Sequence, residues 1–372
     1  MSRRVGTCRT YGVSGREPRP AFCPQPPGRA QIRLSARTAS RRAGGWSVAT
    51  LRLRVQPLHS QLPFLHASSL PLPTLHPSGR AVVCAGEVLW DSLPEGLRLG
   101  GAPYNVAYHL ARLGRPAQLA SRVGDDMLGR EALRRVAAGG VDASLVQTDR
   151  ALPTGFVSVA LDAEGVPTYD IARPAAWDAL ELGPGLERAA EASAAVVFGS
   201  LAQRDARSRR TLRALVAAAP LAVFDVNLRA PHVDPARVEA SLGAAAVVKL
   251  SADELGQLGR WLGLPEAPRD AAEAVGERFG CQAVCVTRGA AGAALWREGR
   301  WAEHAGYAVA VRDTVGAGDA FLAGLVAAWL DGRDEATALD WGSRLGAFVA
   351  SQSGATPAYS AGDLRRMAAP PG

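Results

Sequence analysis

The chain has 372 residues, of which 48% are hydrophobic and 21% are charged, a composition typical of a globular protein that buries a full core. It contains no charge-free run of about 18 apolar residues, which argues against a membrane span. Thirteen arginines and one acidic residue lie in residues 1–80, so the net charge of +7 belongs to this segment and residues 81–372 carry −5. This distribution gives little support for a nucleic-acid partner.

Residues 1–80 are rich in Arg, Pro and Ser and show neither helical nor strand periodicity, which predicts a disordered leader. Two origins remain open for it, an organelle transit peptide and upstream sequence translated from a misplaced start. We therefore expect a cytoplasmic protein, with a plastid or mitochondrial location as the alternative if the leader is a genuine transit peptide.

Five cysteines are too few and too scattered for a disulfide framework, which fits a reducing compartment. Cys281 and Cys285 lie close together, but Cys285 falls within an apolar run typical of a buried strand. No Cys/His pair nearby would complete a metal site, so core packing is the favoured interpretation.

After residue 80 the sequence alternates between short apolar runs and helical patterns, which predicts an α/β domain over residues 81–372. The runs typical of buried parallel strands are 82–85, 196–198, 222–224, 245–248 and 283–286. The candidate helices are 103–113, 126–138, 206–218, 252–261, 269–279, 316–331 and 334–352. This pattern predicts a doubly wound, mostly parallel sheet that binds ligands at the carboxyl ends of its strands.

Two segments interrupt the alternation. The pattern of residues 157–161 and 168–171, around a turn at 162–165, predicts an antiparallel hairpin. Together with residues 92–100, the strands near 155–172 are expected to form a small β lid that excludes water from transfer chemistry.

A glycine-rich turn at residues 313–319, Asp-Thr-Val-Gly-Ala-Gly-Asp, precedes an apolar helix. Here Gly316, Ala317 and Gly318 can direct several backbone N–H groups at one point, which favours anion binding. Asp319, in the first helical turn, is either a carboxylate favoured by the helix dipole or a proton acceptor. A carboxylate facing an anion repels it, so the position makes most sense if Asp319 takes a proton from an incoming hydroxyl.

This turn resembles the C-terminal signature of the ribokinase-like carbohydrate kinases, the PfkB family, and the resemblance covers residues 81 to about 360. It implies a three-layer ribokinase-like fold and ATP-dependent phosphorylation of a sugar hydroxyl. It also implies that Asp319 is the catalytic base and that the backbone of Gly316, Ala317 and Gly318 is the anion hole.

Other segments resemble the family's sugar-binding and nucleotide-binding elements. In the sugar-binding element, bare glycine backbone lets a polyol approach closely, and Asp and Asn side chains supply acceptors and donors for its hydroxyls. The residues implied for the sugar are Asp91, Gly100, Gly101, Asn105 and Arg173. Those implied for the nucleotide and its phosphates are Asn227, Arg229, Ser251, Thr287, Gly289, Gly292 and Gly354. Glu254 is implied to organise Mg²⁺ and Asp313 to hold K⁺, although Ser251 stands where the family has Asn.

The element Asp225-Val226-Asn227-Leu228-Arg229 and the segment after Arg173 resemble the fructokinase-like branch, so fructose is the expected substrate. Another sugar, a nucleoside or a sugar acid on the same fold remains open, as does an inactive sugar-binding regulatory protein. A dinucleotide-dependent oxidoreductase is disfavoured, because no Gly-x-Gly-x-x-Gly follows the first strand. The expected partners are the sugar and ATP, with a homodimer by analogy only and neither nucleic acid nor membrane.

Overall fold

The computed structural model describes residues 79–93, 96–161 and 167–367, and its strands form a nine-stranded and a four-stranded sheet. The nine-stranded sheet has the order β13-β12-β11-β10-β9-β8-β1-β4-β5. Its strands are β1 Val82–Ala85, β4 Ala117–Gly124, β5 Val146–Asp149, β8 Ala195–Gly199, β9 Ala222–Asp225, β10 Val247–Ser251, β11 Ala283–Thr287, β12 Ala293–Arg297 and β13 Arg300–His304.

The seven strands from β11 to β5 pair in parallel, while β12 and β13 add an antiparallel edge. The predicted parallel sheet is thereby confirmed, but the strand expected at 245–248 runs two to three residues later, as Val247–Ser251. Strands β4, β5, β12 and β13 were not predicted, because their apolar runs are short or interrupted by polar residues.

The four-stranded sheet has the order β3-β2-β6-β7, from β2 Leu89–Leu93, β3 Gly96–Gly100, β6 Gly155–Leu161 and β7 Pro167–Ile171. The two hairpins β2–β3 and β6–β7 join through the parallel pair β2–β6. This is the small sheet expected from the two interrupting segments, and the turn expected at 162–165 lies outside the described residues.

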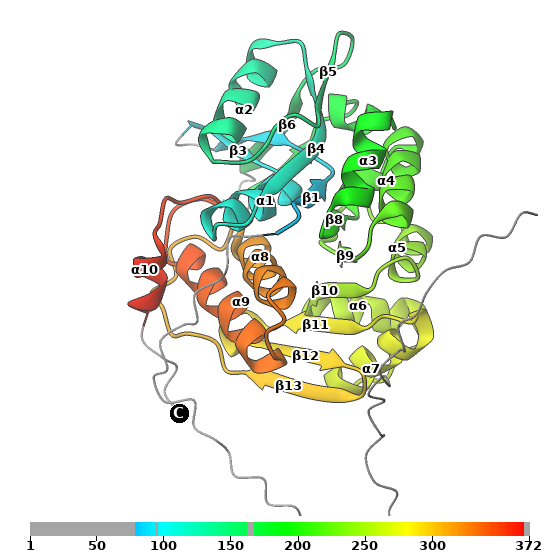
Figure 1. The fold of residues 1–372 in the computed structure, drawn as a ribbon, viewed down its shortest axis with the longest axis vertical. Coiled ribbons are helices and arrows are strands. Elements are labelled where there is room, and N and C mark those ends of the chain that lie inside the picture. Colours follow the sequence, from blue (N-terminus) through cyan, green and yellow to red (C-terminus); the bar gives the residue numbers. More distant parts are fainter. Residues whose placement is uncertain (1–78, 94–95, 162–166, 368–372) are drawn as a thin grey trace, which may run out of the picture. The chain divides into compact units, whose positions relative to one another are not determined.

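Helices cover both faces of the large sheet (Figure 1), so the described chain forms three layers. One buried cluster joins the sheet to α1, α2, α8 and α9, and the other joins it to α3–α7. The α-helices are α1 Ala102–Arg112, α2 Met127–Ala138, α3 Pro184–Ala192, α4 Ala206–Ala218, α5 Pro235–Leu242, α6 Ala252–Leu262, α7 Pro268–Phe279, α8 Ala317–Leu330, α9 Glu335–Ala350 and α10 Ala361–Arg365.

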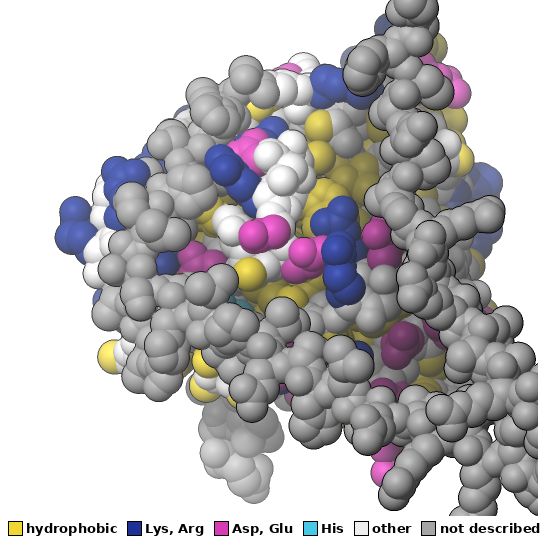
Figure 2. All heavy atoms as spheres, turned by 60° about the horizontal axis from the view of Figure 1, so that its bottom comes forward, with side chains coloured by type: hydrophobic (Ala, Val, Ile, Leu, Met, Phe, Trp, Pro, Cys, Tyr) yellow, Lys and Arg dark blue, Asp and Glu magenta, His cyan; other side chains and the backbone are white. Residues whose placement is uncertain are grey.

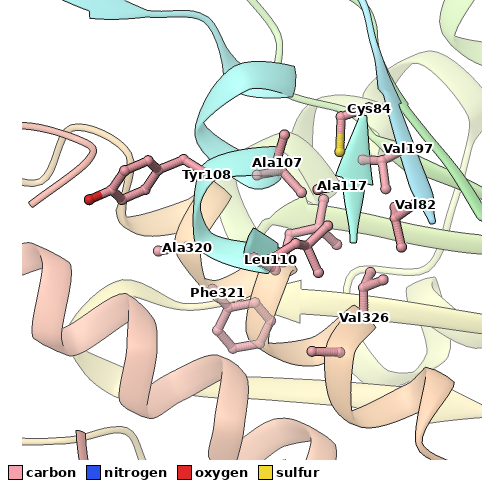
Figure 3. Close-up of a cluster of buried hydrophobic side chains, with 14 of the residues drawn as sticks. Val82, Cys84, Ala107, Tyr108, Leu110, Ala117, Val197, Ala320, Phe321 and Val326 are labelled. Atoms are coloured by element: carbon pink, nitrogen blue, oxygen red, sulfur yellow. The ribbon is translucent and has the colours of Figure 1, made fainter. Parts of the chain in front are cut away.

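Helix α8 is buried on all sides. Its residues from Asp319 to Ala328 are all buried, and side chains of α8, α1 and the central strands meet in one cluster (Figure 3). Helix α9 packs against it so closely that a Cβ built on Gly324 would lie 2.6 Å from the carbonyl oxygen of Trp341. The apolar composition of α8 therefore reflects burial between the sheet, α1 and α9.

The Cys281 and Cys285 side chains are buried and are free thiols, as expected from core packing. No helix among the residues described is long and apolar enough to cross a membrane. On the face shown in Figure 2, acidic and basic side chains are interspersed rather than gathered by sign.

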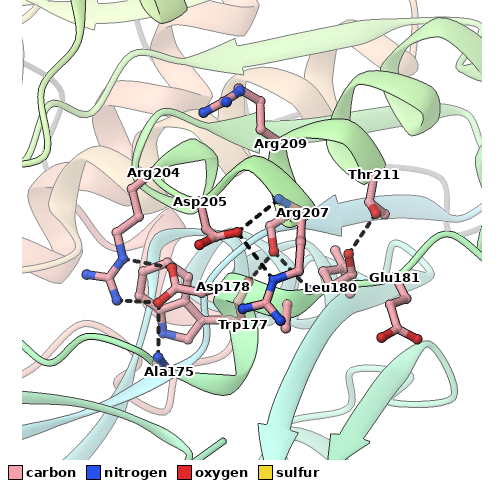
Figure 4. A network of polar contacts seen from close by, with 12 residues as sticks. Ala175, Trp177, Asp178, Leu180, Glu181, Arg204, Asp205, Arg207, Arg209 and Thr211 are labelled. Atoms are coloured by element: carbon pink, nitrogen blue, oxygen red, sulfur yellow. Dashed lines mark hydrogen bonds and ion pairs between the residues drawn. The ribbon is translucent and has the colours of Figure 1, made fainter.

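A buried ion pair fixes the chain where β7 leaves the small sheet (Figure 4). The guanidinium of Arg204 donates to both carboxylate oxygens of Asp178, each at 2.8 Å, and both side chains are 1% exposed. Arg204 also donates to the carbonyl oxygens of Ile171 and Ala172 and stacks 3.9 Å over the ring of Trp177. One cation thus ties the end of β7 to the body of the protein.

Replacing Asp178 with Ala should lower the free energy of unfolding by about 3–5 kcal/mol, because Arg204 stays buried without its counter-charge. Urea unfolding of the variant and the wild type measures this loss. The control is Glu131→Ala, which removes ion pairs of the more exposed Arg134 and Arg135 and should lower the stability far less, because exposed pairs are screened by solvent. Equal losses in the two variants would contradict the interpretation.

Candidate active site

The glycine-rich turn ends in the first turn of α8, at the carboxyl end of the parallel strands. Gly316 is the N-cap with a left-handed φ of 77°, and a Cβ built on it would lie 2.3 Å from the Cβ of Ala355. Glycine is therefore required there for both its backbone and its size. The backbone N–H groups of a helical first turn have no intrahelical acceptor, so this end of α8 can hold an anion.

Asp319 and Asn105 meet across two helices that are distant in the sequence. The Nδ2 of Asn105, on α1, donates to the Oδ2 of Asp319, on α8, at 2.8 Å. Both side chains are buried, at 5% and 8% exposure, and the Oδ1 of Asn105 has no hydrogen-bond partner among the described residues. The structure thus brings the predicted sugar-binding Asn beside the predicted base.

The strand pair β2–β3 brings the carboxylate of Asp91 close to the bare backbone of Gly100, whose strand partner is Leu89. A Cβ built on Gly100 would lie 2.5 Å from the Oδ2 of Asp91, and one on Gly101 would lie 2.5 Å from the backbone oxygen of Glu87. Burial raises the pKa of Asp91 to about 6, and the nearby guanidinium of Arg229 opposes this rise. The glycine pair therefore lets two carboxyl-bearing segments approach α1.

Glu87 belongs to the same cluster, and the sequence analysis missed it. Its side chain is 3% exposed, and its Oε2 has no hydrogen-bond partner among the described residues. Burial raises the pKa of Glu87 to about 7, with Arg229 lowering it and Asp319 raising it further. The missed signal was its position, since Glu87 is the second residue after β1 at the carboxyl edge of the sheet, as Asn227 is the second after β9.

Asp225 and Lys249 are cross-strand neighbours on β9 and β10. The Nζ of Lys249 donates to both carboxylate oxygens of Asp225, at 3.0 and 3.2 Å, and both side chains are buried. A Cβ built on Gly318 would lie 3.0 Å from that Nζ, so the pair lies directly beside the first turn of α8. Lys249 was not among the predicted site residues.

Glu254 holds the segment after β9 in place. Its carboxylate accepts the backbone N–H of Leu228 at 2.7 Å and that of Ser251 at 2.8 Å. Ser251 accepts the N–H of Glu254 in return, so the two form a capping box at the start of α6. Beside Leu228, Asn227 has a positive φ of 38°, which is uncommon for a residue other than glycine.

Asp313 links the glycine-rich turn to the segment after α9. Its two oxygens accept the N–H groups of Val315 and Gly354, at 3.0 and 2.9 Å. Arg98 of β3 donates to Ser353, and a Cβ on Gly354 would lie 2.3 Å from its guanidinium.

The remaining predicted nucleotide residues lie in the turn from β11 to β12. Thr287 ends β11 and donates to the backbone oxygen of Leu250 at 3.4 Å. Gly289 and Gly292 have left-handed φ angles of 57° and 81°, and a Cβ on Gly292 would lie 2.0 Å from the oxygen of His304. This turn adjoins β10 because β10 and β11 are paired.

Arg173 stands apart from these residues. Its side chain is 53% exposed and lies 3.8 Å from the carboxylate of Asp205, the N-cap residue of α4. Its contacts among the described residues do not join it to Asp319, so a role at the sugar stays a prediction. Within the same residues, no group of three or more His, Cys, Asp or Glu side chains is arranged to hold a metal ion.

A buried histidine holds the C-terminal segment against α1. The Nε2 of His109 lies 2.8 Å from the oxygen of Ala355, and its Nδ1 lies 3.1 Å from the hydroxyl of Tyr359. A carbonyl only accepts, so Nε2 carries the proton and Nδ1 accepts from Tyr359. Burial lowers the pKa of His109 to about 4, so the ring is neutral. Through Ala355, α1 supports Gly316 of the turn.

Comparisons with known proteins agree with this arrangement. A family model described as pfkB family carbohydrate kinase matches residues 95–361. The fructokinase of Klebsiella pneumoniae is 34% identical over 255 residues, which is 65% of this chain and 82% of its own. Fructokinase from Vibrio cholerae O395, solved in a fructose, ADP and calcium ion bound form, has a TM-score of 0.67 at 27% identity, covering 77% of this chain and 98% of its own.

Aminoimidazole riboside kinase from Salmonella enterica, complexed with aminoimidazole riboside and an ATP analogue, has a TM-score of 0.63 at 25% identity, covering 76% and 98% of the two chains. The fold and the matches define an ATP-dependent carbohydrate kinase, a phosphotransferase whose acceptor is an alcohol group. The chain belongs to the pfkB family, as the motif resemblance predicted.

The buried His109 should make stability fall in mild acid. Because its folded pKa of about 4 lies below the ordinary 6.5, the unfolded chain binds the proton first as the pH falls. Its contribution is complete above pH ~6.5 and is lost between there and pH ~4, by about 3 kcal/mol at most. Urea unfolding at pH 7, 6 and 5 measures this loss. His109→Gln should show a shallower decline, and an identical slope would contradict the prediction.

Proposed function

We propose that the protein transfers the γ-phosphoryl group of ATP to a primary hydroxyl of a ketose, with fructose as the substrate. The observation that carries the proposal is the buried pair of Asn105 and Asp319 at the N-terminus of α8. It sets a carboxylate beside a group of N–H donors, which is the arrangement that alcohol phosphorylation needs. The fructokinase names of the relatives support fructose.

Asp319 would accept the proton of the attacking hydroxyl while the amides of Gly316, Ala317 and Gly318 hold the transferred group. An ordinary aspartate is a weak base, so the advantage would come from position. Asn105 supports this role, because its amide holds one oxygen of Asp319 and leaves the other for the hydroxyl.

Buried acceptors without donors favour a hydroxyl-rich ligand. The Oδ1 of Asn105 and the Oε2 of Glu87 have no partner among the described residues, although buried polar atoms are normally satisfied. Sugar hydroxyls would supply the missing donors, with Asp91, Gly100 and Gly101 completing this side. Arg173 would join them only after moving from Asp205, so it is the weakest of the sugar residues.

The nucleotide would lie along the loops at the other side of α8. Asn227, Arg229 and Ser251 would face the phosphates. Thr287, Gly289 and Gly292 after β11 and Gly354 after α9 would line the base and ribose, because glycine backbone allows them to approach closely.

Mg²⁺ fits this site as an ion held mainly by phosphate oxygens and water. Glu254 already accepts two backbone N–H groups, which leaves lone pairs for ordered water, so it would organise the hydration shell. When bound, the ion would neutralise phosphate charge. Asp313 likewise keeps lone pairs that would serve a K⁺ ion.

The remaining expectations are proposals of the same kind. Residues 1–80 would be a leader outside the kinase domain of residues 81–372, and the protein would act in the cytoplasm unless that leader directs it to a plastid or mitochondrion. The small sheet would serve as the lid, and through its edge strands as the contact of a homodimer.

A second candidate acceptor is a nucleoside-type riboside, favoured by the similarity to aminoimidazole riboside kinase. Coupled assays of ADP release with fructose, ribose, 2-keto-3-deoxygluconate and aminoimidazole riboside separate the two. We expect the highest kcat/KM with fructose. A higher value with the riboside would replace the fructose proposal.

Asp319→Asn should lower kcat by about 10²–10⁴-fold, because the amide cannot accept the hydroxyl proton. Its Kd for ATP, measured by calorimetry, should stay close to that of the wild type. The matched control is Asp270→Asn, which changes an exposed aspartate at the same first-turn position of α7 and should leave kcat unchanged. Full activity of Asp319→Asn would refute the assignment.

A further inference from the structure

Lys249 is the single lysine of a chain that has 42 basic residues, the rest of which are arginines. It is 5% exposed and lies in the middle of the sheet, at a position otherwise suited to an apolar side chain. A buried ammonium is costly unless paired, and lysine differs from arginine in presenting a compact point charge. Its location therefore needs a reason.

Its surroundings are acidic. Burial by itself would lower the pKa of Lys249, but Asp225, Asp319 and Glu254 outweigh this effect and raise it. Burial also raises the pKa of Asp225, to about 6, against the lowering effect of Lys249. The ammonium of Lys249 thus interacts electrostatically with Asp319 and Glu254 as well as with Asp225, the carboxylate to which it donates hydrogen bonds.

Its position relative to α8 is equally specific. A Cβ added to Gly318 would lie 3.0 Å from Nζ, so a larger residue there would push the amine away from the first turn of α8. The planar fork of an arginine would need more room between Asp225 and this turn. Lys249 therefore places one positive charge beside the first turn of α8, where it interacts with Asp319.

We propose that Lys249 is a positioning residue of the transfer site, whose charge keeps the carboxylate of Asp319 ionised while the ATP phosphates approach. This inference rests on the proposed role of Asp319 as base. ATP adds negative charge to a site already rich in carboxylates, which favours protonation of Asp319. A proton held there would remove the acceptor that the reaction needs.

Other groups also face Asp319 and set the same balance. Glu87 before β2, Asn105 on α1 and Asp225 on β9 interact with Asp319 itself. Around them, Arg229 after β9 acts on Glu87, Glu254 on α6 acts on Asp225 and Lys249, and the thiol of Cys285 on β11 lies beside Lys249. The acids outnumber the cations in this set, so loss of Lys249 should make the electrostatic potential at Asp319 more negative.

The direct test is a ¹³C-NMR titration of aspartate carboxyl groups, with the Asp319 signal assigned from Asp319→Asn. In Lys249→Met the signal should titrate roughly 1 pH unit or more above its wild-type midpoint. An unmoved midpoint would overturn the proposal. This readout needs no substrate, so it stands whether or not the wild type phosphorylates any sugar of the panel, and the panel alone decides the proposed function.

A double variant separates this role from simple charge pairing with Asp225. Lys249→Met should lower kcat about a hundredfold and move the acid limb of the pH profile to higher pH. Lys249→Met/Asp225→Asn removes both buried charges and should regain stability in urea unfolding, while its kcat stays as low. Recovery of kcat together with stability would show that Lys249 only neutralises Asp225, and would overturn the proposal.

The remaining variants exclude general damage. Asp225→Asn keeps the ammonium and should retain more activity than Lys249→Met; an equal loss would assign the effect to Asp225 and overturn the proposal. Arg115→Met removes another buried cation, paired with Asp331 away from the site, and should leave the Asp319 titration unmoved. A midpoint that moves equally in Arg115→Met would likewise count against Lys249.

Discussion

The first turn of α8 can face the carboxyl ends of β9 and β10 only because the rest of that helix is buried. Packing by the sheet, α1 and α9 leaves it no free face, and close contact at Gly324 fixes its height against α9. The direction of the helix therefore sets where its N–H groups and Asp319 lie. The other site residues come from α1, α6, the carboxyl ends of the strands and the turns that follow them, which all lie around this one helix end.

Much of the fold was predictable because buried parallel strands are apolar runs. The first strand was predicted with its observed bounds, and seven helices were predicted within one or two residues at either end. The strand at Val247–Ser251 was placed too early because Lys249 interrupts its apolar run, and only the ion pair with Asp225 lets it continue. Arg122 similarly disguised β4, since its partner Asp149 lies on β5.

The site was predictable motif by motif, but its assembly was not. Asn105 and Asp319 are 214 residues apart, and nothing local to either indicates their hydrogen bond. Glu87 and Lys249 belong to short apolar segments that read as core, so their charges were overlooked. Arg173 was predicted to bind the sugar from the motif around it, whereas its observed partner is Asp205, the N-cap residue of α4.

The buried bonds of His109 have a practical consequence for handling this enzyme. Residues 355–359 follow the last long helix and look dispensable by position, yet they are held by α1 and lie against Gly316. A truncation ending at Ala350 would therefore remove the residue packed against Gly316 and leave Tyr108, His109 and Arg112 of α1 without their partners. Affinity tags and fusion partners belong beyond this segment, and shortened versions should retain it.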